Sequence, residues 1–149
     1  MTRLINEITI NAPVEKIWQI LSTVRELEKF DPTVEKSTQT SPIASGLGAS
    51  RKVDMKDGKN WFEEKTTAYT PNEALAFDLT DCSFPINKLK HSYSFLTIGS
   101  QTKVTQVMEY HVKFGLLGKL SDSVMIRKQT DNGIKKFFGG LSAYVEKMR

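Results

Sequence analysis

The spacing of hydrophobic and polar positions changes along the 149-residue chain in an order that can be read as structure. Residues 3–10 alternate imperfectly but are rich in β-branched side chains, which predicts a first strand. Residues 13–21 have helical spacing, with Pro13 where a first helical residue would stand. A second short helix is expected over 25–30, because an Asp-Pro pair follows and the residue before a proline avoids the α region.

Residues 34–114 have the signals of antiparallel strands joined by turns, and the chain closes on a helix with apolar residues at three- and four-residue steps. The expected turns lie at 41–49, Asp57-Gly58, Pro71-Asn72 and Gly99-Ser100. The order is strand, two short helices, a run of strands and one terminal helix. This is an α+β pattern in which a curved antiparallel sheet wraps around the last helix, in one domain spanning 1–149.

The turns also predict which side chains share a face. A two-residue turn at Asp57-Gly58 puts Arg51 opposite Glu64, and Val53 opposite Phe62. The turn at 71–72 places Phe77 opposite Thr66, Leu75 opposite Ala68, and Leu79 opposite Glu64. The turn at 99–100 pairs Phe95 with Val104, Tyr93 with Gln106, His91 with Met108, and Leu89 with Tyr110. Trp61 and Tyr69 fall on the other face. Independent turns that give one coherent apolar face support this register, since a one-residue slip would invert every side chain.

The predicted apolar face carries a charge pair, Arg51 with Glu64. Isolated charges there are costly, whereas a hydrogen-bonded Arg–carboxylate pair recovers much of the cost. Two interpretations stay open: a structural pair at the rim of a cavity, or polar anchors of a small-molecule site. The candidate ligand-binding residues are Arg51, Val53, Met55, Phe62, Glu64, Phe77, His91, Tyr93, Phe95, Gln106, Met108, Tyr110, Phe137 and Gly140, with Val104 as a further wall residue.

Composition narrows the classes of function. The net charge is +4, and the basic residues are scattered among acidic ones along the chain, which argues against nucleic acid as a partner. No run of about 18 to 20 apolar residues and no secretory signal is found, so we expect a cytoplasmic protein without stable membrane insertion, as a monomer or weak homodimer. The lone Cys82 is more typical of packing than of a reactive thiol. His91 and His111 fall on opposite faces, so no metal site is predicted. We also expect no cofactor, and we assign no catalytic residue from the sequence.

Several stretches resemble the SRPBCC superfamily of START-domain, birch-pollen-allergen-like and polyketide cyclase/dehydrase-like proteins. They are INAPVEKIWQIL, FDPTVEKS, GLGASRKV, EKTTAYTPNEALAFDL and FGLLGKL. The resemblance implies a helix-grip fold, in which a seven-stranded antiparallel sheet curls around a long C-terminal helix and a cavity holds an apolar or amphipathic molecule. It also implies structural roles for Pro13, Trp18 and Glu64, and a bend into the last helix at 116–118.

Three functions follow as hypotheses. The first is binding or carriage of a hydrophobic molecule such as a lipid, isoprenoid, quinone or polyketide-like compound. The second is a cyclase/dehydratase-type enzyme that uses acid–base catalysis, for which Glu64, His91, Tyr93 and Tyr110 are chemically able. The third is a protein- or membrane-interaction module that uses a sheet edge or an exposed Trp61/Tyr69 face.

Glycines at 133, 139 and 140 predict a break or kink in the last helix, a close approach to the sheet, or room for a ligand.

Overall fold

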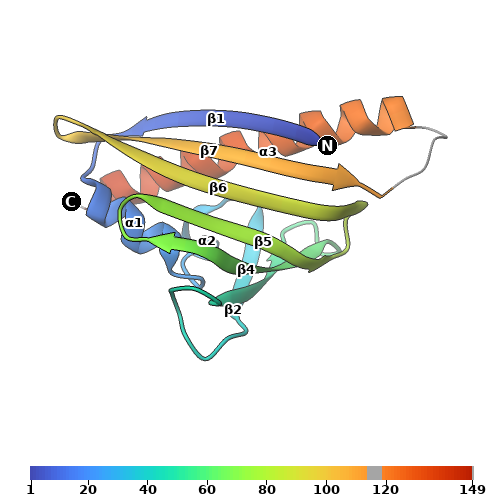
Figure 1. Ribbon diagram of the computed structural model, residues 1–149, viewed down its shortest axis with the longest axis horizontal. Helices are drawn as coiled ribbons and strands as arrows, with labels where there is room; N and C mark the ends of the chain where they lie inside the picture. Colours follow the sequence, from blue (N-terminus) through green and yellow to red (C-terminus); the bar gives the residue numbers. More distant parts are fainter. Residues whose placement is uncertain (114–118, 149) are drawn as a thin grey trace.

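The computed structural model describes residues 1–113 and 119–148, so the expected bend at 116–118 lies outside the described residues (Figure 1). The elements are β1 (Thr2–Ile10), α1 (Val14–Ser22), α2 (Leu27–Phe30), β2 (Val34–Gln39), β3 (Ser50–Met55), β4 (Trp61–Thr70), β5 (Ala74–Cys82), β6 (Ile86–Ile98), β7 (Gln101–Val112) and α3 (Lys119–Lys147). Pro13 is the residue before α1 and has an extended ψ of 153°, so the helix begins one residue later than predicted. Likewise α2 is shorter than the predicted 25–30.

The strands form one seven-stranded antiparallel sheet in the order β1-β7-β6-β5-β4-β3-β2. Figure 1 shows the curved sheet with α3 lying across it behind β1 and β7, and with α1 and α2 near the C-terminal end of α3. This arrangement confirms the α+β helix-grip prediction. Among the described residues, no helix is long and apolar enough to cross a membrane.

The core lies between the concave face of the sheet and α3. The helix buries the apolar face that its spacing predicts except at Met148, which is exposed beyond the end of α3, and α1 covers one end of the sheet with Trp18. The buried residues of α3 are Ile134, Phe137, Phe138, Leu141 and Val145. Burying these large side chains stabilises the fold by roughly 1.5–3 kcal/mol each, which explains why a chain with one cysteine needs no cross-link.

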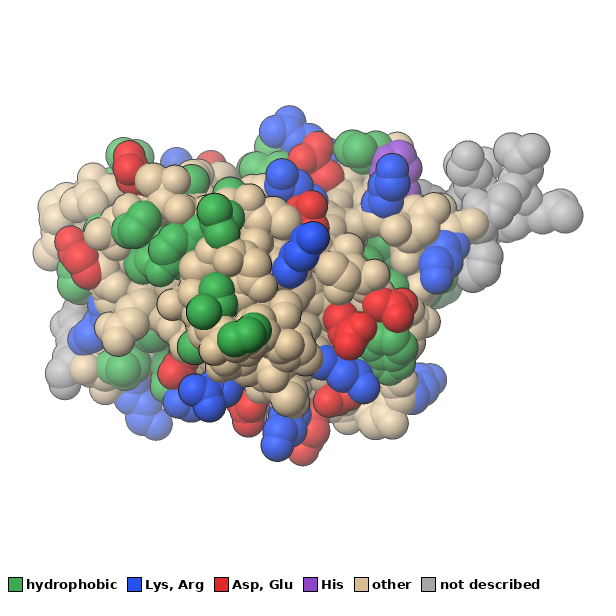
Figure 2. Space-filling model, turned by 60° about the horizontal axis from the view of Figure 1, so that its bottom comes forward, with side chains coloured by type: hydrophobic (Ala, Val, Ile, Leu, Met, Phe, Trp, Pro, Cys, Tyr) green, Lys and Arg blue, Asp and Glu red, His purple; other side chains and the backbone are tan. Residues whose placement is uncertain are grey.

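The outer surface mixes charge and apolar groups. The loop between β2 and β3 projects from the molecule and exposes Ile43 and Leu47 (Figure 1). On the face turned forward in Figure 2, hydrophobic side chains gather near the centre, and lysine or arginine side chains stand among acidic ones. This face therefore presents no continuous basic band.

Most of the predicted register is confirmed, including Arg51 opposite Glu64 and every predicted pair between β6 and β7. One pair is wrong: Leu75 lies opposite Tyr69 rather than Ala68. The cause is a β-bulge between Thr66 and Ala68, where β4 advances two residues while β5 advances one. The extra residue turns Tyr69 inward.

The inward position of the Tyr69 side chain changes one of the functional hypotheses. Tyr69 packs edge-on against Trp18, with ring centroids 5.1 Å apart. Trp61 remains half-buried on the other side of the sheet under Lys52, whose ammonium nitrogen lies 5.2 Å from a ring centroid. Trp61 and Tyr69 therefore do not share a surface, and the interaction hypothesis retains only its other alternative, the sheet edge.

The glycines of α3 have separate explanations. The helix runs unbroken through all of them, so the predicted break is wrong. Gly140 is a close approach, but to the end of α2 rather than to the sheet: a Cβ there would overlap the Phe30 carbonyl oxygen and lie 3.0 Å from Pro32 Cδ. A Cβ at Gly133 or Gly139 would meet nothing within 4 Å.

Candidate functional site

A cavity of about 320 Å³ lies between the inner face of the sheet and the middle of α3. This volume is at the lower end of the roughly 300–1,000 Å³ range of small-molecule sites. Its walls are mainly apolar, with a few polar side chains. The lining residues are Leu27, Asp31, Thr33, Arg51, Met55, Phe62, Glu64, Leu79, Cys82, Phe84, Pro85, Ile86, Leu89, His91, Tyr93, Gln106, Met108, Ile126, Gln129, Thr130, Gly133, Ile134 and Phe137.

A buried ion pair stands at one side of this cavity. The register of β3 and β4 brings Arg51 opposite Glu64, and Arg51 Nε donates to Glu64 Oε2 over 2.7 Å. Arg51 Nη1 donates to the Val24 carbonyl oxygen over 3.3 Å, and its guanidinium carbon lies 4.7 Å from the centre of the Phe77 ring. Both charged residues are almost fully buried, so each is the counter-ion that the other requires.

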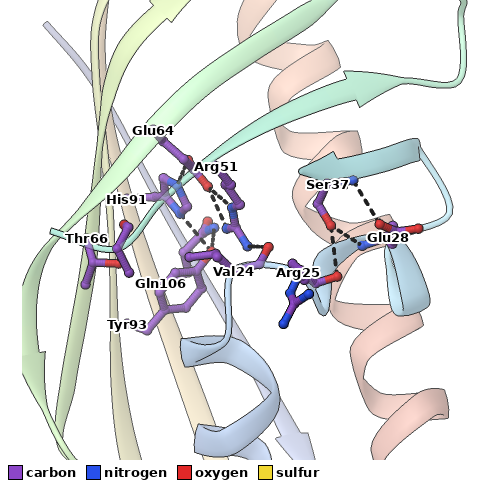
Figure 3. Close-up of polar contacts among 11 residues, drawn as sticks. Val24, Arg25, Glu28, Ser37, Arg51, Glu64, Thr66, His91, Tyr93 and Gln106 are labelled. Atoms are coloured by element: carbon purple, nitrogen blue, oxygen red, sulfur yellow. Dashed lines mark hydrogen bonds and ion pairs between the residues drawn. The ribbon is translucent and has the colours of Figure 1, made fainter. Parts of the chain in front are cut away.

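The second carboxylate oxygen of Glu64 begins a chain of hydrogen bonds along β6 and β7. His91 Nε2 lies 2.7 Å from Glu64 Oε1, and His91 Nδ1 lies 2.9 Å from the Tyr93 hydroxyl. Gln106 Nε2 donates to that hydroxyl over 3.0 Å. Figure 3 shows these side chains pointing toward one another from β4, β6 and β7. The pairing of Tyr93 with Gln106 and the strand alternation of His91 and Tyr93 produce this convergence.

The directions of these hydrogen bonds follow from the Glu64 end of the chain. The Glu64 carboxylate only accepts, so His91 Nε2 carries a hydrogen and donates it. In the tautomer that has its hydrogen on Nε2, His91 Nδ1 accepts from the Tyr93 hydroxyl. The Tyr93 oxygen then accepts from Gln106 Nε2. The Gln106 Oε1 atom is left without a partner among the described residues.

Burial and neighbouring charge act on the titratable groups in opposite directions. Burial alone would raise the pKa of the Glu64 carboxyl, but the charge of Arg51 and the bonds from Arg51 and His91 outweigh it and hold the pKa at about 2. Burial raises the pKa of the Tyr93 hydroxyl well above its ordinary value, so it stays protonated. Burial also raises the pKa of the Asp31 carboxyl, against the two bonds it accepts from Thr33.

The predicted site residues divide into two groups. Those that line the cavity are Arg51, Met55, Phe62, Glu64, His91, Tyr93, Gln106, Met108 and Phe137. Those that do not are Val53, Phe77, Phe95, Val104, Tyr110 and Gly140. Alternation along a strand identifies the inner face of the sheet. The cavity borders only the part of that face against which the helices do not pack directly.

The residues outside the cavity are held by packing. Phe77 stacks on His91, with ring centroids 5.1 Å apart, and so supports the network from behind. Phe95 packs edge-on against Trp18 at 5.7 Å. Gly140 faces the end of α2, so a large residue there would disrupt helix packing rather than reduce the cavity. Tyr110 is buried, and its hydroxyl has no partner among the described residues.

Sequence reasoning missed several parts of the wall, including the segment from Cys82 to Ile86 between β5 and β6. Asp31 and Thr33, after α2, face the cavity, and the only sequence signal was their place in the FDPTVEKS stretch. Residues of α3 from Ile126 to Gly133 also line it at helical spacing. Continuing the three- and four-residue steps of the terminal helix toward its beginning would have found them.

The described residues contain no group of three His, Cys, Asp or Glu side chains placed to hold a metal ion. Cys82 lies at the cavity wall with its sulfur 3.4 Å from the Ile86 carbonyl oxygen and 3.5 Å from that of Phe84. The described polar and apolar residues of the cavity wall offer hydrogen bonding, apolar contact and proton exchange.

A curved antiparallel sheet that grips a long helix over a cavity of this kind defines the helix-grip class. The chain belongs to the family described as polyketide cyclase / dehydrase and lipid transport, whose family model matches residues 1–146. This membership confirms the resemblance to the SRPBCC superfamily. The family description covers both enzymes and carriers, so membership leaves the choice between them open.

Solved structures show the same fold at low identity. A START superfamily protein from Mycobacterium smegmatis is 15% identical, with a TM-score of 0.81 and 99% of each chain covered. The Zhui aromatase/cyclase from Streptomyces sp. R1128 is 11% identical, with a TM-score of 0.84 over 98% of this chain and 94% of that one. Ara h 8.0201 is 18% identical, with a TM-score of 0.71 and 98% of each covered. No curated protein matches this chain.

Proposed function

We propose that this protein binds or carries a hydrophobic small molecule in the cavity between the sheet and α3. The observation that carries the proposal is the cavity itself, about 320 Å³ with largely apolar walls and a small set of converging polar groups. A core that only needed stability would be filled at this position, because close packing is the rule in protein interiors. The family's description, which includes lipid transport, supports the same conclusion.

The buried pair of Arg51 and Glu64 fits both interpretations that the sequence left open. It is a structural pair, because each charge neutralises the other and Arg51 also holds the carbonyl of Val24 before α2. It also lines the cavity. Removing either partner would leave a buried charge alone, which typically costs about 3–5 kcal/mol.

Acid–base catalysis of the cyclase/dehydratase type is a second candidate, favoured by the hydrogen-bond chain at the wall. Glu64 stays ionised and Tyr93 stays protonated near neutral pH. His91, bonded to both, is then the group placed to take up or release a proton. Turnover that is lost in His91→Gln while ligand affinity is kept would favour an enzyme over a carrier.

The test of binding compares two glycines on the same helix. Gly133 lines the cavity, whereas Gly139 is exposed, and a Cβ added at either position would meet no heavy atom within 4 Å. We expect Gly133→Leu to fill part of the cavity and reduce affinity for a neutral apolar fluorophore such as N-phenyl-1-naphthylamine at least tenfold. Gly139→Leu should leave the affinity unchanged.

Native mass spectrometry of freshly purified protein, repeated under denaturing conditions, would identify any compound carried through purification. Equal affinity in both leucine variants would contradict the proposed site. No bound compound and no probe binding would favour the interaction-module hypothesis and make partner capture the next step. The single domain, the monomeric or weakly dimeric state, the cytoplasmic location and the exclusion of nucleic acid stay predictions.

A further inference from the structure

The charges at the cavity wall bear on the kind of ligand that it accepts. The charged lining residues are Arg51, Glu64 and Asp31. Arg51 and Glu64 neutralise each other, and Asp31 adds a carboxylate whose Oδ1 accepts two bonds from Thr33. Among the residues that the structure describes, no lysine lines the cavity. A bound anion would therefore be removed from water without a free counter-ion, which carries a large desolvation penalty.

Gln106 supplies a second, independent observation. Its side chain is 2% exposed, it belongs to the cavity wall, and its Oε1 has no partner among the described residues. The hydrogen-bond directions fix which end of the amide is free. In the His91 tautomer with its hydrogen on Nε2, the Tyr93 hydroxyl donates to His91 Nδ1, the Tyr93 oxygen accepts from Gln106 Nε2, and the carbonyl end of Gln106 remains as an acceptor.

A buried acceptor without a donor is unfavourable, and most such atoms in proteins are satisfied. The opposite amide orientation would require His91 to donate from both ring nitrogens, and so to carry a charge beside a carboxylate that Arg51 already neutralises. A donor on a molecule in the cavity satisfies Gln106 without that change.

We propose that the cavity takes an uncharged, largely apolar molecule carrying a hydroxyl or N–H donor, and that Gln106 Oε1 accepts this donor. The inference rests on the proposed ligand-binding function and deepens it. The cavity volume of about 320 Å³ lies at the lower end of the range of small-molecule sites. A compact molecule of one or two rings with a polar end fits this description.

Three naphthalene probes of matched size separate charge from hydrogen bonding. They are 2-naphthol, 2-methoxynaphthalene and 2-naphthoate, measured by isothermal titration calorimetry at pH 7. We expect 2-naphthol to bind about tenfold more tightly than the methyl ether, because an unmet buried acceptor costs on the order of 1–3 kcal/mol, and 1.4 kcal/mol is tenfold in affinity. The naphthoate anion should bind more weakly than either.

The variants assign the preference to one atom. Gln106→Leu should bring the affinities for 2-naphthol and its methyl ether within about twofold of each other, and Gln106→Met serves if the leucine variant does not fold. Tyr110→Phe is the matched control, because it removes a buried hydroxyl that also lacks a partner among the described residues, without changing the cavity wall. It should keep the preference of the unchanged protein.

The outcomes separate this inference from the function on which it rests. Equal binding of all three probes, or a preference that survives in both Gln106 variants, would overturn the donor-acceptor inference while leaving hydrophobic binding intact. Tight binding of 2-naphthoate would overturn the exclusion of anions. Failure of all three probes to bind, with N-phenyl-1-naphthylamine also unbound, would overturn the proposed function itself.

Discussion

Replacing Gly140 by alanine places a methyl group against the end of α2. The added carbon would overlap the Phe30 carbonyl oxygen and lie 3.0 Å from Pro32 Cδ and 3.1 Å from the Phe30 carbonyl carbon. The overlapped atom belongs to the backbone, so no rotamer change relieves it. Gly139 is the matched control, because it is the preceding residue of the same helix and a Cβ there meets nothing within 4 Å.

The two substitutions should change stability in opposite directions. Alanine is favoured over glycine inside a helix by about 1 kcal/mol, and Gly139→Ala should gain roughly this amount. At Gly140 the same gain is opposed by an overpacking cost of about 3 kcal/mol, at the upper end of the usual range because the obstacle is backbone. The expected net loss is about 2 kcal/mol.

Thermal and urea unfolding followed by circular dichroism would measure both effects. For a domain of about 150 residues, 1 kcal/mol corresponds to roughly 2–4 °C in Tm. We therefore expect Gly139→Ala to raise Tm by about 2–4 °C and Gly140→Ala to lower it by about 4–8 °C. If Gly140→Ala were as stable as Gly139→Ala, α3 would not contact the Phe30 carbonyl, and the packing of α2 described above would be refuted.

Two further predictions concern buried polar groups. The Glu64 carboxyl has its pKa lowered from the ordinary value near 4.5 to about 2, so the folded state binds fewer protons and loses up to about 3 kcal/mol as the pH falls from about 4.5 toward 2. Urea unfolding should show this acid sensitivity, and an Arg51→Met/Glu64→Leu variant with an unchanged pH slope would contradict it. Ser37 Oγ donates to the Arg25 carbonyl and accepts from Glu28 N, so Ser37→Ala should cost about 1–3 kcal/mol in urea unfolding (Figure 3). Exposed Ser94→Ala should change stability by no more than about 0.5 kcal/mol, and equal losses in the two variants would refute the role of Ser37.

The sequence by itself determined the order of elements and most of the sheet. Alternation and turn residues are local signals, and a two-residue turn at Asp57-Gly58 leaves one register that hides the apolar side chains. That register brought Arg51 and Glu64 together, and the turn at 99–100 brought Tyr93 and Gln106 together. The charge pair and one link of the hydrogen-bond chain, Tyr93 with Gln106, could therefore be anticipated.

The tertiary structure alone decided which part of the inner face borders a cavity. The bulge after Thr66 turns Tyr69 onto Trp18, and its position has no signature in the turn residues. Contacts between elements far apart in sequence also depend on how helices dock. Gly140 meets Phe30 across 110 residues of chain, and Asp31 joins a wall built mainly by the sheet and α3.

The direction of the hydrogen-bond chain from Glu64 to Gln106 likewise follows only from the tertiary structure. Turns and strand alternation can place Glu64, His91 and Gln106 on one face. They cannot show that His91 lies 2.7 Å from the Glu64 carboxylate while the Gln106 carbonyl has no partner among the described residues. Hydrogen bonds depend on distances of a few tenths of an ångström, whereas the periodicity of a sequence specifies only faces. The sequence therefore predicts which face of the sheet carries the site, whereas the packing of the strands and helices determines the geometry of the site.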